Sequence, residues 1–315
     1  MPLHPAAQAM RDQRARDQVP PLYTMTLAEA RAADLASIQA AGGTPEPVAE
    51  ITDLTYPGPA GDLPVRVYRP SADRRLPVLV YFFGGGWTLG SIETSDGICR
   101  GLANAAGCVV VTPGYRLAPE ARFPAAVDDC VAAVGWVAEQ AAALGVDPAR
   151  VAVGGDSAGG NLAAAVTLAL REGAGPPLVA QLLVYPNTDY TAADGSMAEM
   201  TDAALFNRTS VGWYWGHYLA DPADGLHPLA SPLLAGDLSG LPPALVVTAE
   251  YDPLRDQGEA YARRLRAAGV PVELTRYDGM VHGFFAMSGT FDDGLAAIRQ
   301  AADFLHNRFV EPTPA

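Results

Sequence analysis

The chain has 315 residues, of which 49% are hydrophobic, and it carries a net charge of −14. This length allows one large α/β domain or two small ones, with enough apolar side chains for a sizeable core. The acidic balance excludes the basic surface of nucleic-acid-binding proteins and argues against attraction to anionic lipid headgroups. No apolar run approaches the roughly 20 residues that span a bilayer, and residues 1–18 lack a signal-peptide core, so we expect a cytoplasmic protein without nucleic-acid or membrane partners.

The residue types exclude several mechanisms. All 21 basic residues are Arg, so a Schiff-base lysine, a Ser–Lys dyad and a P-loop lysine are all impossible. The three cysteines, Cys99, Cys108 and Cys130, form neither a CxxC pair nor a zinc-ligand spacing. We therefore expect no disulfide framework, no metal and no cofactor.

Residues 1–45 are predicted to be helical and polar, and the pattern ends at a glycine pair that is typical of a helix stop. From residue 63 onward, short apolar runs alternate with helical patterns. The predicted strands cover residues 63–69, 77–83, 108–115, 150–155, 180–186, 244–250 and 272–279, and the predicted helices cover residues 123–145, 160–173, 256–269 and 291–309. Apolar strands that alternate with helices form mostly parallel sheets covered on both faces, so the pattern predicts a single α/β domain.

Three consecutive glycines, Gly84 to Gly86, follow the predicted strand at 77–83. Glycine weakens regular structure, so this run indicates either a flexible loop or a backbone that must approach another group closely. Bare N–H groups in such a loop could donate to the oxyanion of a tetrahedral acyl intermediate, which needs donors at about 2.7–3.1 Å.

The segment Gly155-Asp156-Ser157-Ala158-Gly159 matches the G-x-S-x-G pattern between a predicted strand and a predicted helix. In that context the serine occupies a tight turn that raises its hydroxyl above the edge of the sheet. A phosphate-binding glycine turn is the alternative, but the lysine of a P-loop does not exist in this chain. We therefore predict that Ser157 is a nucleophile and that the amide of Ala158 is one oxyanion donor.

Residues 188–225 interrupt the alternation of strands and helices with an aromatic-rich helical pattern. Neither this segment nor residues 1–45 looks able to fold alone, so we expect them to form one helical cap over the sheet, the alternative being that they thicken the core. Aromatic residues of the cap could shape an acyl pocket or pack as ordinary core. The expected pocket residues are Phe83, Trp87, Leu205, Phe206 and Trp213.

A serine hydroxyl needs a base, and the chain has five histidines. His282 is placed best, in a glycine-flanked loop just after the predicted strand at 272–279. Asp252 directly follows the strand at 244–250 and is the expected orienting carboxylate. Asp256 is a rival, but it falls in the first turn of a helix, where its ordinary role is to stabilise the helix dipole. The order Ser157, Asp252, His282 is the order found in α/β hydrolases.

The chain resembles the bacterial hormone-sensitive-lipase-like esterases, a family of capped α/β hydrolases, over nearly its whole length. The resemblance rests on the glycine loop and on the segments YRLAPE (115–120), GDSAGGN (155–161), DPLRD (252–256) and HGF (282–284). It implies an α/β-hydrolase fold, an oxyanion hole made by Gly85, Gly86 and Ala158, a cap pocket for short to medium acyl chains, and a possible homodimer. It also implies structural roles for Arg116 and Glu120.

Together these features predict a serine carboxylesterase that hydrolyses short to medium acyl esters through an acyl-enzyme on Ser157. The family has His where this chain has Phe83, before the three glycines. The loop could be held by packing instead, could be looser and slower, or could favour acyl transfer to an alcohol or amine. An acyltransferase is therefore one alternative. A small-molecule binding protein is a second, less favoured because Asp252 and His282 are both present.

Overall fold

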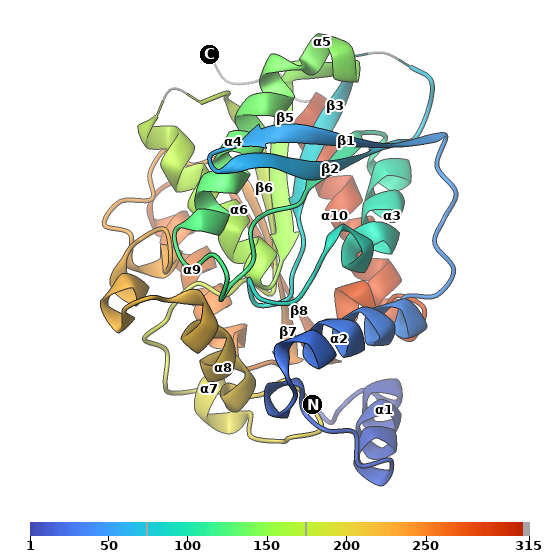
Figure 1. The fold of residues 1–315 in the computed structure, drawn as a ribbon, viewed down its shortest axis with the longest axis vertical. Helices are drawn as coiled ribbons and strands as arrows, with labels where there is room; N and C mark the ends of the chain where they lie inside the picture. The colour runs from blue at the N-terminus through green and yellow to red at the C-terminus, as the bar shows by residue number, and fades with distance from the viewer. Residues whose placement is uncertain (74, 174, 311–315) are drawn as a thin grey trace.

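The computed structural model describes residues 1–73, 75–173 and 175–310, and within them an eight-stranded sheet forms the centre (Figure 1). The strand order is β1-β2-β4-β3-β5-β6-β7-β8. The pairs β1–β2 and β2–β4 are antiparallel, and every following pair is parallel, which confirms the predicted mostly parallel sheet. The strands are β1 (Glu50–Gly58), β2 (Gly61–Arg69), β3 (Leu76–Phe82), β4 (Val109–Pro113), β5 (Val146–Asp156), β6 (Leu178–Val184), β7 (Ala244–Tyr251) and β8 (Val272–Val281).

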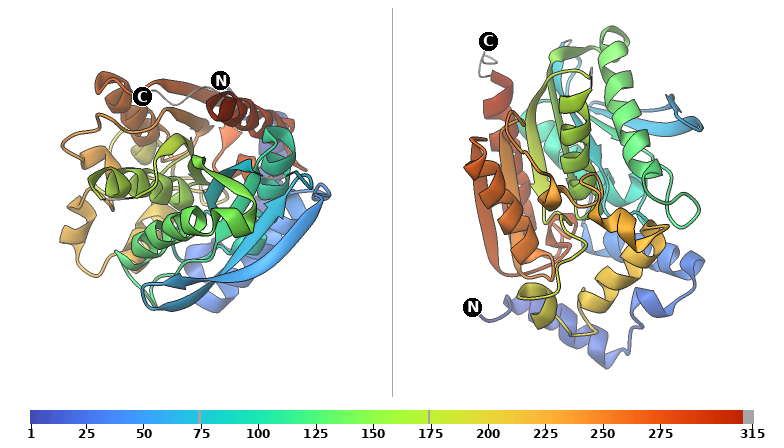
Figure 2. Two further views of the ribbon diagram at one scale, coloured as in Figure 1. Left: turned by 90° about the horizontal axis from the view of Figure 1, so that it is seen from above. Right: turned by 90° about the vertical axis from the view of Figure 1, so that its left-hand side faces the viewer.

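Helices cover both faces of the sheet, as the views in Figure 2 show. Because successive side chains of a strand point to opposite faces, Val80 and Phe82 of β3 join the core on one face, and Leu79 and Tyr81 join the core on the other. The first face packs against α4 (Ala125–Glu139), α6 (Ala158–Glu172) and α9 (Arg255–Ala267), and the second against α3 (Asp96–Ala106) and α10 (Asp292–Val310).

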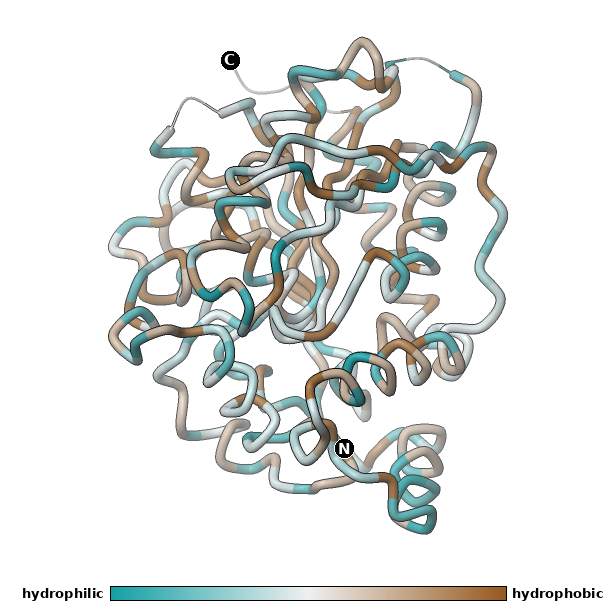
Figure 3. The backbone as a smooth tube through the Cα atoms, viewed as in Figure 1, coloured by the Kyte–Doolittle hydropathy of each residue, from teal (hydrophilic) through white to brown (hydrophobic). Residues whose placement is uncertain are grey.

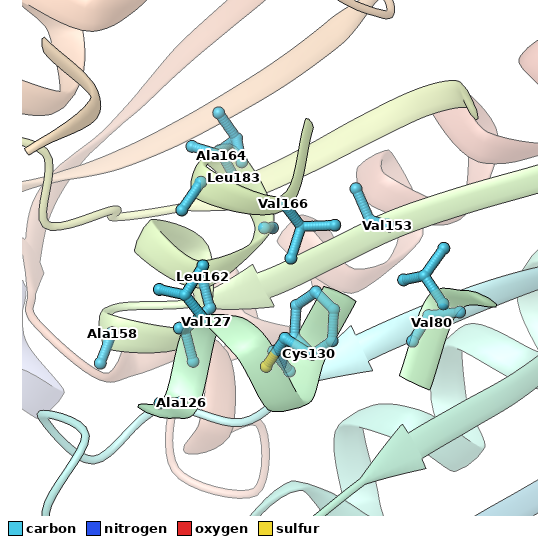
Figure 4. Packing of buried hydrophobic residues seen from close by; sticks show 14 of the residues in the cluster. Val80, Ala126, Val127, Cys130, Val153, Ala158, Leu162, Ala164, Val166 and Leu183 are labelled. Atoms are coloured by element: carbon cyan, nitrogen blue, oxygen red, sulfur yellow. The ribbon is translucent and has the colours of Figure 1, made fainter. Parts of the chain in front are cut away.

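The helix that follows Ser157 is deeply buried. Figure 4 shows Leu162 and Val166 of α6 beside Val127 and Cys130 of α4 and close to Val153 of β5. This burial fits the Ala-rich sequence of α6, which is apolar around much of its circumference. The turn that carries Ser157 is therefore anchored on a buried helix and a central strand.

The two predicted cap segments lie at one end of the sheet, at the bottom of Figure 1. In Figure 3 hydrophilic residues alternate with weakly hydrophobic ones along the first helix there, whereas the central strands are largely hydrophobic. Ala30, in the second helix, packs with Leu89 and Tyr214 in a small apolar cluster, so the two segments contact each other. The helices at this end are α1 (Pro5–Arg16), α2 (Leu27–Ala41), α7 (Ser196–Glu199) and α8 (Arg208–Tyr218).

Three elements differ from the sequence-based prediction, and the first is α3, which was not among the predicted helices. β1 was not predicted, because as an edge strand it is exposed along most of its length and lacks a strong apolar alternation. The predicted helix at 123–145 is divided at Gln140 into α4 and a short α5 (Ala141–Leu144). Over the residues that the structure describes, we find no helix with both the length and the apolarity to cross a membrane.

Candidate active site

Ser157 lies on the turn between β5 and α6, as the G-x-S-x-G pattern predicts. Its backbone has φ 56° and ψ −117°, a strained conformation for a residue other than glycine. A Cβ atom on Gly159 would collide with the carbonyl group of Phe82, so only glycine lets the helix start this close to β3. The turn thereby places the Ser157 hydroxyl at the N-terminus of α6 and at the carboxyl end of the sheet.

Three side chains meet at the carboxyl ends of β5, β7 and β8. His282 Nε2 lies 3.0 Å from Ser157 Oγ, and His282 Nδ1 lies 2.7 Å from Asp252 Oδ2. Asp252 is fully buried, and its other oxygen accepts a hydrogen bond from the amide of Leu254 at 2.8 Å. In this arrangement the imidazole can take the serine proton while the carboxylate holds the tautomer that carries a proton on Nδ1.

Two other carboxylates near the end of β7, those of Asp256 and Glu250, have other partners. The Asp256 carboxylate accepts hydrogen bonds from the amide of Ser196 and from the guanidinium of Arg255. Glu250 accepts from a backbone amide and from the N-terminal amine. Of the five histidines, His282 is the one that lines the cavity next to Ser157.

The glycine loop after β3 is held from two sides. The Asp156 carboxylate accepts hydrogen bonds from the amide of Gly84 at 3.1 Å and from the hydroxyl of Tyr81 at 2.9 Å. On the other side, the Tyr115 hydroxyl donates to the Phe83 carbonyl at 2.8 Å, and the two rings stack with their centroids 4.3 Å apart. This geometry favours the interpretation that packing holds the loop in the absence of an imidazole at position 83.

Asp156 is a buried carboxyl group beside the glycine loop. Burial raises the pKa of its carboxyl above the ordinary value, and the hydrogen bond from the Tyr81 hydroxyl opposes that shift. The carboxyl ties the residue before Ser157 to the first glycine of the loop. The contacts of Asp156 are those of a residue that positions the loop.

The predicted oxyanion donors are Gly85, Gly86 and Ala158. Within the described ranges, none of these three amides has a hydrogen-bond acceptor in the protein. Gly86 has φ 59°, and a Cβ atom there would collide with the ring of Tyr214. Gly85 and Gly86 line the same cavity as Ser157. Free donors beside a serine are what a developing oxyanion requires.

A cavity of about 760 Å³ opens beside Ser157 and lies under α2 and α8. Three of the five residues expected in the pocket line it, namely Leu205, Phe206 and Trp213. Much of the remaining wall is apolar and comes from α2 and the segment before it, where the side chains include Val19, Leu22, Met25 and Ile38. Other parts of the wall come from α1 and from residues 281–290.

The prediction that Phe83 and Trp87 line the pocket is wrong. Trp87 is fully buried, and its ring stacks on Tyr218 with the centroids 4.1 Å apart. Phe83 is 2% exposed and packs on Tyr115. Both rings belong to the hydrophobic core, where they support the loop from below the cavity wall rather than lining it.

Sequence reasoning missed a contact to the imidazole of His282. The Phe206 ring stacks on the imidazole of His282, with the centroids 4.1 Å apart and the planes 21° apart. Tyr185 approaches the same imidazole from another side, with the ring centroids 4.6 Å apart. The aromatic content of the segment was a signal for a pocket, but the partner of Phe206 depends on a contact between distant parts of the chain. Across the residues described, no group of three or more His, Cys, Asp or Glu side chains is placed to hold a metal ion.

A family model described as the alpha/beta hydrolase fold matches residues 79–286. Carboxylic ester hydrolase LipN of Mycobacterium tuberculosis is 49% identical over 75% of this chain, which spans 64% of LipN. Ethyl acetate hydrolase of Pseudomonas putida is 41% identical over 91% of this chain and 93% of its own length. The solved esterase of Pyrobaculum calidifontis has a TM-score of 0.93 and 42% identity over 98% of this chain and 99% of its own. The chain therefore belongs to the α/β hydrolase family whose relatives include these esterases.

Proposed function

We propose that this carboxylic ester hydrolase acts through an acyl-enzyme on Ser157, with His282 as the base and Asp252 as the carboxylate that orients it. The observation that carries the proposal is the pair of hydrogen bonds that join the three side chains, at 3.0 Å and 2.7 Å. A serine hydroxyl is a weak nucleophile unless a positioned base removes its proton during attack.

The first half of the reaction forms the acyl-enzyme. The Ser157 oxygen attacks the ester carbonyl carbon, and its proton passes to His282 Nε2. The carbonyl oxygen becomes negatively charged, and the amides of Gly85, Gly86 and Ala158 donate to it. The imidazolium then returns the proton to the alkoxide as the C–O bond breaks, and the alcohol leaves.

The second half releases the acid. Water loses a proton to His282 as its oxygen attacks the acyl carbon, and the same amides stabilise the second oxyanion. Collapse of this intermediate breaks the bond to Ser157, which recovers its proton from the imidazolium. The phenyl ring of Phe206 covers one face of the imidazole, and this contact supports a fixed orientation of the base in both halves.

The size and the apolar wall of the cavity support a proposal for the class of substrate. A volume of about 760 Å³ with a mostly apolar wall is within the size range of small-molecule sites. We propose that α1, α2, α7 and α8 act as a cap and that the cavity accepts short to medium acyl esters. One relative is an ethyl acetate hydrolase, which supports the proposal that the acyl group of the substrate is short.

The test is hydrolysis of p-nitrophenyl esters of graded acyl length by the purified protein and by Ser157→Ala. We expect hydrolysis of the short and medium esters, and a loss of about 10⁵-fold or more in Ser157→Ala, because nucleophile and base act as one unit. Circular dichroism of the variant controls for folding. Near wild-type hydrolysis by a folded Ser157→Ala protein would remove Ser157 from the mechanism.

A further inference from the structure

An acidic side chain lies on the wall of the otherwise mostly apolar cavity. Asp34, on α2, lines the cavity that contains Ser157 and His282. Its Oδ2 atom is buried and has no hydrogen-bond partner among the residues described. Burial of a carboxylate without a partner costs free energy, and buried polar groups in proteins are normally paired. Asp34 thus has hydrogen-bonding capacity that the protein itself does not use.

Among the residues that the structure describes, no cation is paired with this carboxyl. The groups that act on it are the amide of Gly90 and the carboxylate of Asp156, and in the described part of the chain no arginine pairs with it. Burial raises the pKa of Asp34 to about 6, which the amide of Gly90 opposes and Asp156 increases. Near neutral pH the side chain is therefore a carboxylate that still lacks a positive partner.

Aromatic rings line the same cavity as the carboxyl, and Tyr214 is one of them. Asp34 is close enough to Tyr214 to raise the pKa of that phenol, after the larger effect of burial. The Tyr214 ring in turn covers Gly86 of the glycine loop. Trp213, the neighbour of Tyr214 in the sequence, also lines the cavity. Aromatic faces attract ammonium groups by about 0.5–2 kcal/mol, most strongly where water is excluded.

We propose that Asp34 and the ring of Tyr214 bind an ammonium group of the substrate, so that the natural ester is cationic. The inference rests on the proposed function and extends it to the class of substrate. The net charge of −14 favours the approach of cations to the protein. An ammonium group would supply the partner that the carboxylate lacks, while the rest of the ester occupies the apolar wall.

The experiment compares pairs of esters that differ only in charge. One pair is butyrylcholine and its neutral isostere, in which a tert-butyl group replaces trimethylammonium. In this pair the positive charge lies in the alcohol part of the ester. The other pair is the methyl ester of a trimethylammonio-pentanoate and its tert-butyl isostere. In this pair the positive charge lies in the acyl part. The measured quantity is the ratio of kcat/KM for the cationic ester to kcat/KM for its isostere, in which any common change in the catalytic machinery cancels.

We expect Asp34→Asn to lower this ratio by about tenfold or more for at least one pair, because the amide keeps the shape but loses the charge. Glu139→Gln is the matched control, since it removes one negative charge from an exposed position at the end of α4. This control should keep the wild-type ratio. Equal ratios in wild type and Asp34→Asn for both pairs would overturn the proposal.

The pH dependence of the ratio in wild type needs no variant. As pH falls from about 8 to about 5, the carboxylate of Asp34 becomes neutral and the ratio should fall with it. A change with pH in the activity of the catalytic groups affects both esters of a pair and cancels in the ratio. The other charged or titratable groups on the cavity wall are Arg14, Tyr23, Asp156, Tyr185 and Tyr214.

A ratio that stays constant over this range would contradict the role of Asp34. Failure of the wild-type protein to hydrolyse either neutral isostere would instead count against the proposed function, so the two failures are distinguishable. A ratio that depends on pH in wild type and not in Asp34→Asn is the result that supports the proposal most strongly.

Discussion

Asp252 is a fully buried carboxylate whose two oxygens are engaged by His282 and by the amide of Leu254. The sequence left Asp256 as a rival, since both aspartates follow the same strand within a few residues. The structure distinguishes the two aspartates, because Asp256 accepts hydrogen bonds from Ser196 and Arg255 and not from the imidazole of His282.

Asp252→Asn should lower kcat by about 10⁴-fold, because the amide favours the wrong tautomer of His282. Asp256→Asn is the matched control and should reduce thermal stability while keeping most of the turnover, since it weakens a contact to α7. Steady-state kinetics and melting curves of both variants check this prediction. The reverse pattern would transfer the orienting role to Asp256.

Phe83 stacks on Tyr115 in a slot that leaves it 2% exposed. Phe83→His would place a polar ring in that slot without an evident partner, at a cost of about 1–3 kcal/mol in the free energy of unfolding. Because the loop is already held by Asp156 and Tyr115, we expect no gain in kcat. A higher kcat with an unchanged KM would show that disorder of the loop limits the wild-type enzyme.

At the scale of elements, α8 has two aromatic faces with different surroundings. Trp213 lines the cavity, whereas Trp215 is 4% exposed and lies 4.6 Å from Trp87, centroid to centroid. The sequence could not separate pocket from core in this run of aromatic residues, because both faces of the helix carry large rings. The neighbours of each ring come from distant segments, and a helical period alone does not identify them.

Trp213→Ala should shift the preferred acyl length upward, because it enlarges the cavity wall. Trp215→Ala should leave the preference unchanged and reduce the free energy of unfolding by about 3–5 kcal/mol, as expected for a truncated buried aromatic residue. Activity on esters of graded length, together with denaturant unfolding, distinguishes the two effects. A changed stability with an unaltered substrate profile in Trp213→Ala would assign this residue to the core.

The predictable elements were those with strong local patterns. The central strands and the helices α6, α9 and α10 lie close to their predicted ranges, since continuous apolar runs and amphipathic periods mark them. The edge strand β1 and the break after α4 had no such signal. Asp34 was missed for a related reason, because a single acidic residue in a polar helix resembles a solvated side chain until the cavity beside it is known.

At the scale of the whole molecule, the sheet brings together residues that are far apart in the sequence. Ser157 and His282 are 125 positions apart, and His282 and Asp252 are 30 apart, yet all three follow strands that end at the same edge. Parallel strands place their carboxyl ends together, so the topology alone accounts for the meeting of the three side chains. The G-x-S-x-G motif and the chain order therefore indicated that Ser157 and His282 would lie together with a carboxylate that follows β7. The choice between Asp252 and Asp256, and the pocket, depended on packing that the sequence does not show.

The central claim is that Ser157 becomes acylated, and covalent labelling tests it most directly. A fluorophosphonate should add once to the wild-type protein, and peptide mass spectrometry should locate the adduct on Ser157. Ser157→Ala should not be labelled, and His282→Ala should be labelled far more slowly, because the base activates the nucleophile. Absence of an adduct on Ser157 in folded wild-type protein, or labelling that persists in Ser157→Ala at the wild-type rate, would contradict the account.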